Sequence, residues 1–147
     1  MSGAGRASGK RCEVSESLKS VGAVTLFVAD PQRSKAFYEQ AFDVPVIWED
    51  GNSAVFKFEN TLVNLLALSE APGLIAPGAV AARDAGSSFM FSIWVDDADA
   101  VCAELATRGV ELLNGPIDRA WGKRTASFAD PDGHIWEIAQ DIEVEAG

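Results

Sequence analysis

The sequence has little of what secreted or membrane-embedded proteins rely on. Its two cysteines, Cys12 and Cys102, are too few for a disulfide framework, and we expect both to be free thiols. No window approaches the roughly 18 consecutive apolar residues that a membrane-spanning helix needs. The first 20 residues lack the apolar stretch of a secretory signal. We therefore expect a cytoplasmic protein that is not inserted in a membrane.

Positive charge is also scarce. The 147 residues include 12 Lys and Arg against 22 Asp and Glu, a net charge of −10. Residues 21–147 carry 8 basic and 20 acidic side chains, which is −12 for this part of the chain. Such a chain repels phosphate backbones and anionic lipid and suits a neutral or cationic small molecule. We expect neither nucleic acid nor membrane as a partner.

Apolar residues, at 48% of the chain, are frequent enough for a packed core. The length predicts one domain, or two small halves that share a core. Residues 1–20 are rich in Gly, Ala, Ser and charge without an apolar period, so we interpret them as a flexible tail. Residues 142–147 form a second short tail. Order is expected to begin near Val21.

A first structural unit can be outlined over residues 21–70. Residues 23–28 alternate with the period of two that predicts a strand. Asp30 and Pro31 then supply an N-cap and a first-turn proline for a helix that Pro45 ends. Three short strands separated by turn residues are predicted next, over 46–48, 54–58 and 62–68.

A second unit repeats this order over residues 87–141, after an Ala-, Pro- and Gly-rich connector at 71–86. Asp97 and Gly109 are the predicted caps of its helix. An offset of 67 aligns Val28 with Val95, Asp30 with Asp97 and Ala36 with Ala103 in the printed sequence. The predicted strands of this unit cover 89–95, 110–113, 124–128 and 135–140. The order β-α-β-β-β thus occurs twice, which indicates an internal duplication.

Two motifs give the chain a family resemblance: residues 28–38, VADPQRSKAFY, and the closing F-x-D-P-D-G-x-x-x-E of residues 128–137. Together with the doubled βαβββ order, they resemble the vicinal oxygen chelate superfamily of glyoxalase I, extradiol dioxygenases, fosfomycin-resistance enzymes and bleomycin-binding proteins. The resemblance covers residues 21–141. It implies an α+β fold in which two modules form cup-shaped mixed sheets with helices on the outer face. It does not fix the chemistry, because the superfamily hosts several reactions as well as pure binding.

The resemblance also implies four positions for the ligands of a divalent metal. Carried over by register, these positions hold Ala23, Asn64, Met90 and Glu137. One carboxylate and one amide hold a catalytic metal poorly, and neither Ala nor Met replaces an imidazole. The single histidine, His134, has the opposite strand parity from Glu137, so we expect it at a strand start and not in a ligand set. The sequence predicts no cofactor and disfavours a metal.

Strand parity predicts which side chains line the cup. The predicted lining is mostly apolar with a few polar groups: Thr25, Phe27, Asn64, Met90, Ser92, Trp94 and Glu137. Trp48, Trp94 and Trp121 are candidates for stacking a planar or cationic ligand, or else for covering core or a dimer interface. Arg124 is a candidate anchor for a ligand carboxylate, or else a surface residue in an ion pair.

Glu137 is the single candidate catalytic residue, as a base or as the counter-ion of a cationic ligand. The first hypothesis is a metal-free, homodimeric small-molecule binding protein similar to the bleomycin-resistance type, with a cationic or aromatic ligand. The second is a glyoxalase-like lyase, isomerase or dioxygenase that uses an atypical metal site or Glu137 as a base. The third is a structural or regulatory protein whose own side chains fill the cup.

Overall fold

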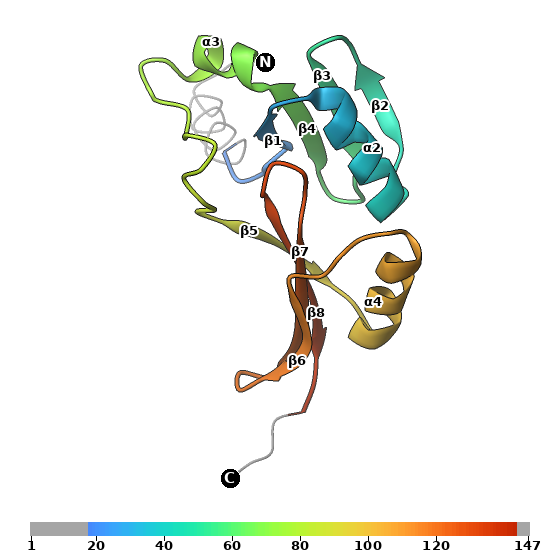
Figure 1. Ribbon diagram of the computed structural model, residues 1–147. Coiled ribbons are helices and arrows are strands. Elements are labelled where there is room, and N and C mark those ends of the chain that lie inside the picture. Colours follow the sequence, from blue (N-terminus) through green and yellow to red (C-terminus); the bar gives the residue numbers. More distant parts are fainter. Residues whose placement is uncertain (1–17, 144–147) are drawn as a thin grey trace, which may run out of the picture.

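The computed structural model describes residues 18–143, which fold as two βαβββ modules (Figure 1). The first module contains β1 (Ala23–Val28), α2 (Pro31–Phe42), β2 (Val46–Glu49), β3 (Ser53–Lys57) and β4 (Leu62–Ala67). A connector opens with a 3₁₀ turn, η1 (Leu68–Glu70), and α3 (Ala71–Ile75). The second module contains β5 (Met90–Trp94), α4 (Ala98–Thr107), β6 (Asn114–Arg119), β7 (Lys123–Ala129) and β8 (Ile135–Asp141). Most of the expected tails, with Cys12, lies outside these residues.

Each module forms one mixed four-stranded sheet. The strand orders are β1-β4-β3-β2 and β5-β8-β7-β6. We name these sheets A and B. In both, the first and last strands of the module pair in parallel and the other pairs are antiparallel. The predicted α+β fold class is therefore confirmed. None of the helices of residues 18–143 has the length and apolar character to cross a membrane.

Both helices begin at the N-cap residues that the sequence predicts. The Asp30 side chain accepts hydrogen bonds from the backbone N–H groups of Gln32 and Arg33, at 3.1 and 3.4 Å, and caps α2. The Asp97 side chain caps α4 in the same way, through the N–H of Ala100 at 3.0 Å. Asp43 ends α2 with φ at 54°, in the left-handed region that Asp tolerates better than most residues.

One predicted strand is wrong. Residues 110–113 are not a strand, and β6 instead covers Asn114–Arg119. The alternation that suggested a strand there arises because Val110 and Leu112 pack on the core as the chain approaches the sheet. Pro116 is tolerated within β6 because β6 is an edge strand with a register shift between Asn114 and Ile117.

Each sheet packs one face on the core and turns the other outward. The core-facing side chains include Leu26, Val63 and Leu65 in sheet A and Phe91, Trp136 and Ile138 in sheet B. The alternation of faces predicted for β5 and β8 is therefore confirmed. We use the name cup face for the opposite side of each sheet. Figure 1 shows α2 and α4 on one side of the molecule and the connector on the other.

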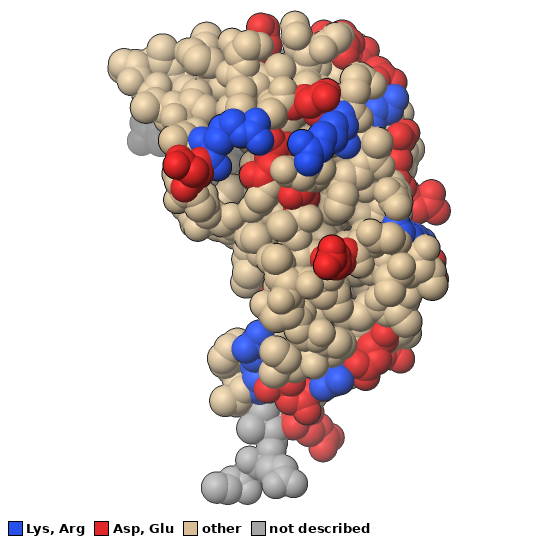
Figure 2. Space-filling view, viewed as in Figure 1, with Lys and Arg blue, Asp and Glu red and all other residues tan. Residues whose placement is uncertain are grey.

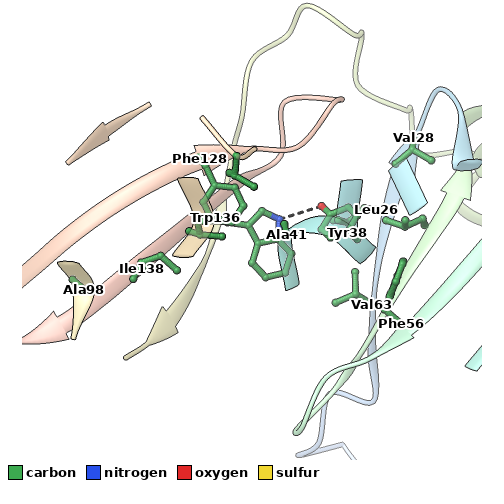
Figure 3. Close-up of a cluster of buried hydrophobic side chains, with 13 residues drawn as sticks. Leu26, Val28, Tyr38, Ala41, Phe56, Val63, Ala98, Phe128, Trp136 and Ile138 are labelled. Atoms are coloured by element: carbon green, nitrogen blue, oxygen red, sulfur yellow. Dashed lines mark hydrogen bonds between the residues drawn. The ribbon is translucent and has the colours of Figure 1, made fainter. Parts of the chain in front are cut away.

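The two modules meet through aromatic packing and through buried hydrogen bonds of Tyr38 (Figure 3). The Trp136 indole lies on β8 with its ring centroid 4.6 Å from that of Phe42 and 5.6 Å from that of Phe58. Its Nε1–H donates to the Tyr38 hydroxyl at 3.1 Å. Tyr38 in turn donates to the Asp130 carboxylate at 2.6 Å. The core is therefore continuous across both modules, and the cup faces lie outside it.

Candidate functional site

The cup face of sheet A is organised in rows across the strands, because directly paired residues point to the same face. One row runs from Thr25 through Asn64 and Val55 to Trp48. The Asn64 side-chain amide donates to the Thr25 hydroxyl at 3.5 Å, a weak contact. Asn64 Oδ1 is buried and has no hydrogen-bond partner. The row thus combines two polar groups with an indole ring at the sheet edge.

The cup face of sheet B carries the corresponding polar pair. The Ser92 hydroxyl donates to Glu137 Oε1 at 2.7 Å, and the two residues are direct partners of the parallel β5–β8 ladder. The next row joins Trp94 to Ala139 and Thr125. The Lys123 ammonium lies 4.7 Å from the centroid of the Trp94 ring.

Large apolar side chains remain exposed on these faces. The exposed fractions are 54% for Trp48, 51% for Met90, 70% for Trp94 and 69% for Trp121. The first three lie on paired strands, whereas Trp121 lies in the β6–β7 turn, where the Arg119 guanidinium carbon is 5.9 Å from its ring centroid. Exposed apolar side chains of this size are candidates for contact with a ligand or with a partner chain.

A concave site lies between β1, the connector and the turn before β8. Its volume is about 260 Å³, enough for a small ligand or one end of a larger one. Thr25 and Phe27 line it together with Arg83 and His134. The Ser87 hydroxyl donates to the carbonyl of Gly133 at 2.7 Å and fastens the connector over this site. Thr25 and Phe27, which the sequence predicts as ligand-binding residues, therefore line a pocket.

The residues at the four family metal positions do not fit a metal ion. Ala23 has no donor atom, and Met90 offers only a thioether, which a hard dication does not prefer. Asn64 and Glu137 belong to different sheets, and Glu137 already accepts a hydrogen bond from Ser92. Within residues 18–143, no group of three or more His, Cys, Asp or Glu is placed to hold a metal. We derive no chemistry through one.

His134 has a defined partner in the closing turn. Its Nδ1 lies 2.7 Å from Oδ2 of Asp130, a carboxylate that is almost completely buried. Burial alone would lower the pKa of His134, but the hydrogen bond and the negative charge of Asp130 outweigh it and raise the pKa. The imidazole is therefore held in the turn by a carboxylate, as a structural residue that also lines the pocket.

Arg124 lies away from the cup. It follows the parity of Ala126 and Phe128, which face the core, and its guanidinium binds Asp99 of α4 at 2.9 Å and Asp118 at 2.8 Å. These contacts raise the pKa of Arg124 above its already high ordinary value. A side chain held by two carboxylates has little capacity left for a ligand.

Among the described residues of sheet B, the basic side chains of the cup face are Arg119 and Lys123, which the sequence reasoning missed. They pair with each other across the β6–β7 hairpin, and Lys123 has the parity of Thr125. The core residue Phe128 could have identified this parity, since counting back from it in steps of two reaches Arg124 and leaves Lys123 on the other face.

Comparisons with known proteins agree with this architecture. Residues 20–138 match the family model of the Glyoxalase/Bleomycin resistance protein/Dioxygenase superfamily. The uncharacterized protein YraH of Bacillus subtilis (strain 168) is 29% identical over 119 residues, which cover 78% of this chain and 93% of YraH.

Solved structures are similar in fold. A glyoxalase/bleomycin resistance protein/dioxygenase from Nocardioides has a TM-score of 0.75 at 20% identity, over 94% of this chain and 99% of that one. Lactoylglutathione lyase from Agrobacterium tumefaciens has a TM-score of 0.67 at 18% identity, over 83% and 93%. At such identities the likeness shows the fold alone.

Proposed function

The chain belongs to the Glyoxalase/Bleomycin resistance protein/Dioxygenase superfamily, and from this premise we propose that it binds a small organic molecule on its cup face without a metal ion. The donor set at Ala23, Asn64, Met90 and Glu137 supports a site that works without a metal. Binding through side chains alone then depends on aromatic surface and on a few fixed polar groups.

The observation that carries this proposal is the Ser92–Glu137 pair beside the exposed Trp94 ring. Ser92 fixes one carboxylate oxygen of Glu137 at 2.7 Å and leaves the other without a protein partner within residues 18–143. Trp94 lies one row further along the same face. An indole that can stack on a planar group and a carboxylate that accepts a hydrogen bond together suit an organic ligand with a donor group.

We propose further that a second copy of the chain closes the site. The cup faces carry exposed large apolar side chains at Trp48, Met90 and Trp94. A homodimer in which these faces meet would remove apolar surface from water and enclose the ligand. The polar pairs Thr25–Asn64 and Ser92–Glu137 would then line one cavity.

The test is a thermal-shift screen of the full chain, with excess EDTA, against a library of aromatic carboxylates, phenols and amines. We expect at least one compound to raise the melting temperature and to bind in titration calorimetry. Glu137→Gln should weaken that binding at least about tenfold, because an amide cannot replace a charged acceptor, and should leave the circular dichroism spectrum unchanged. Glu39→Gln, on the exposed side of α2, is the control and should bind normally.

Other results would contradict the proposal. Unchanged affinity in Glu137→Gln would remove this carboxylate from the site. Stoichiometric divalent metal in protein purified without chelator, measured by elemental mass spectrometry, would instead favour the glyoxalase-like lyase or dioxygenase alternative. A protein that retains no metal and binds no library compound would leave only a structural role.

A further inference from the structure

Arg119 is held on the cup face with much of its hydrogen-bonding capacity unused. Its Nε donates to the buried Thr125 hydroxyl at 2.9 Å, and its guanidinium carbon lies 5.9 Å from the Trp121 ring centroid. No carboxylate of the described residues pairs with it. Within residues 18–143 the two terminal nitrogens of the guanidinium have no hydrogen-bond partner, while the Nε hydrogen bond and the contact with Trp121 restrict its orientation.

Lys123 adds a second positive charge to the same place. Its ammonium lies 4.7 Å from the centroid of the Trp94 ring. Among the described residues its carboxylate partner is Asp141, which is exposed at the end of β8. Arg119 and Lys123 are direct partners in the β6–β7 ladder, so two cations and two indoles occupy one end of the cup face of sheet B.

The acidic groups of this face do not neutralise Arg119. Asp141 contacts Lys123, and Glu137 lies further along β8 with Ser92. Asp118 and Asp99 are the neighbouring acids of the second module, but both bind Arg124 on the opposite side of the sheet. At this end of the cup face the strands therefore carry two basic side chains, Arg119 and Lys123, and one acidic partner, Asp141, although the net charge of the chain is −10.

We propose that the cup face takes an aromatic carboxylate, with the carboxylate bound by Arg119 and the ring placed against Trp94; this inference rests on the proposed binding function and narrows its ligand class. The terminal nitrogens of an arginine match the two oxygens of a carboxylate. Trp121 lies beside Arg119, and Trp94 lies beside the neighbouring Lys123; both indoles provide stacking surface. Glu137, nearer the middle of the face, accepts a hydrogen bond from a hydroxyl or amine at the other end of the ligand.

The overall acidity of the chain does not oppose this ligand. At physiological ionic strength, charges more than about 8 Å apart in solvent are largely screened. The attraction is then decided by the groups that the carboxylate touches, Arg119 and Lys123. The acidic remainder slows the approach of an anion more than it weakens the bound complex.

Three probes with one ring system separate charge from stacking: 2-naphthoate, 2-naphthol and 2-naphthylmethylamine. Binding to the full chain is measured by titration calorimetry. We expect 2-naphthoate to bind most tightly. Arg119→Gln should weaken naphthoate binding by about 10- to 100-fold and leave naphthol binding within about twofold. Arg119→Lys, which keeps the charge and loses the fork geometry, should fall between.

The control variant is Arg33→Gln, which removes the same charge from the exposed side of α2 and should leave all three affinities unchanged. Melting temperatures confirm that each variant is folded, and Arg119→Lys keeps the test valid if Arg119→Gln fails to fold. Preferred binding of the amine, unchanged naphthoate binding in Arg119→Gln, or library compounds that bind while no naphthyl probe does would each overturn the ligand class and leave the binding function standing. Failure of every probe and every library compound would overturn both.

Discussion

At the scale of single residues, the buried Asp130 carboxylate accepts four hydrogen bonds. One carboxylate oxygen accepts the backbone N–H groups of Asp132 and His134, at 2.9 and 2.8 Å. The other accepts the Tyr38 hydroxyl and the His134 imidazole, at 2.6 and 2.7 Å. Burial alone would raise the pKa of Asp130, but the hydrogen bonds from His134 and Tyr38 outweigh it and lower the pKa. The carboxylate therefore stays ionised within the core.

This pairing gives stability a dependence on pH. His134 has a raised pKa in the folded chain, so its contribution is complete below its ordinary pKa of 6.5 and is lost as the pH rises through the higher folded value. We expect the free energy of unfolding, measured by urea denaturation, to fall as the pH rises through that window. The chain has one histidine, so His134→Gln should flatten this slope.

A slope that survives in His134→Gln would assign the effect to another group.

At acidic pH, the dependence of stability on pH has the opposite sign. The pKa of Asp130 is lowered, so its contribution is present above the ordinary value of 3.8 and is lost as the pH falls through the lower folded value. The stability of the unaltered chain should therefore also decline in acid.

Some contacts of single residues could be predicted from the sequence, and others could not. The caps at Asp30 and Asp97 were predictable, because a cap binds backbone groups two or three residues away. The partner of Asp130 was not, because Tyr38 lies 92 residues away in the sequence. The turn motif identified His134 as a strand-start residue, whereas its ion pair depends on how deeply the turn is buried.

At the scale of elements, the β6–β7 hairpin shapes one end of the cup face. Gly115 sits in the irregular part of β6 with φ at +89°, and a Cβ there would lie 2.3 Å from the carbonyl oxygen of Thr125. The close approach of β6 to β7 at this point requires a residue without a side chain. The bulge between Asn114 and Ile117 then sets which side chains of β6 face the cup.

Gly115→Ala should therefore destabilise the chain by about 2 to 5 kcal/mol, from backbone strain and from the clash with Thr125. Gly51→Ala is the matched control, since no atom lies within 4 Å of a Cβ at that position. It should change stability by less than about 0.5 kcal/mol. Chemical denaturation of both variants measures the difference, and equal stabilities would show that β6 can move away from β7.

The same hairpin limited the prediction of the site. In β5 and β8, uninterrupted alternation assigned Ser92, Trp94 and Glu137 to one face. The pairing of the two strands in the structure places them on the same face. In β6, the bulge interrupts the alternation, so counting from either end gives conflicting faces. Arg119 also lies beyond the strand predicted over 110–113, so no face was assigned to it from the sequence. The summed charge of the chain favoured a cationic ligand.

At the scale of the whole molecule, charge and apolar surface are unevenly distributed. Figure 2 shows charged side chains gathered toward the two ends of the viewed face, with a largely uncharged area between them. The exposed apolar side chains of the cup faces come from both modules. Trp48 lies in the first module, and Met90 and Trp94 lie in the second. A single chain leaves these surfaces in water, which is unfavourable.

Light scattering coupled to size exclusion should therefore give a mass near twice the 15.6 kDa of one chain at micromolar concentration. Met90→Lys places a charge in the apolar face and should shift the protein toward a single-chain mass. Gln32→Lys, on exposed α2, adds the same charge elsewhere and should remain a dimer. A mass of 15.6 kDa for the unaltered chain at every concentration would contradict the shared cup.

The contact of Trp136 with Tyr38 links the two modules. The two modules repeat one design, yet the indole of the second donates to the tyrosine of the first, and that tyrosine is held by Asp130 of the second. Either module alone would expose half of this arrangement, with a buried polar group left without its partner. Neither module can therefore satisfy these groups alone, and each depends on the other for its buried hydrogen bonds.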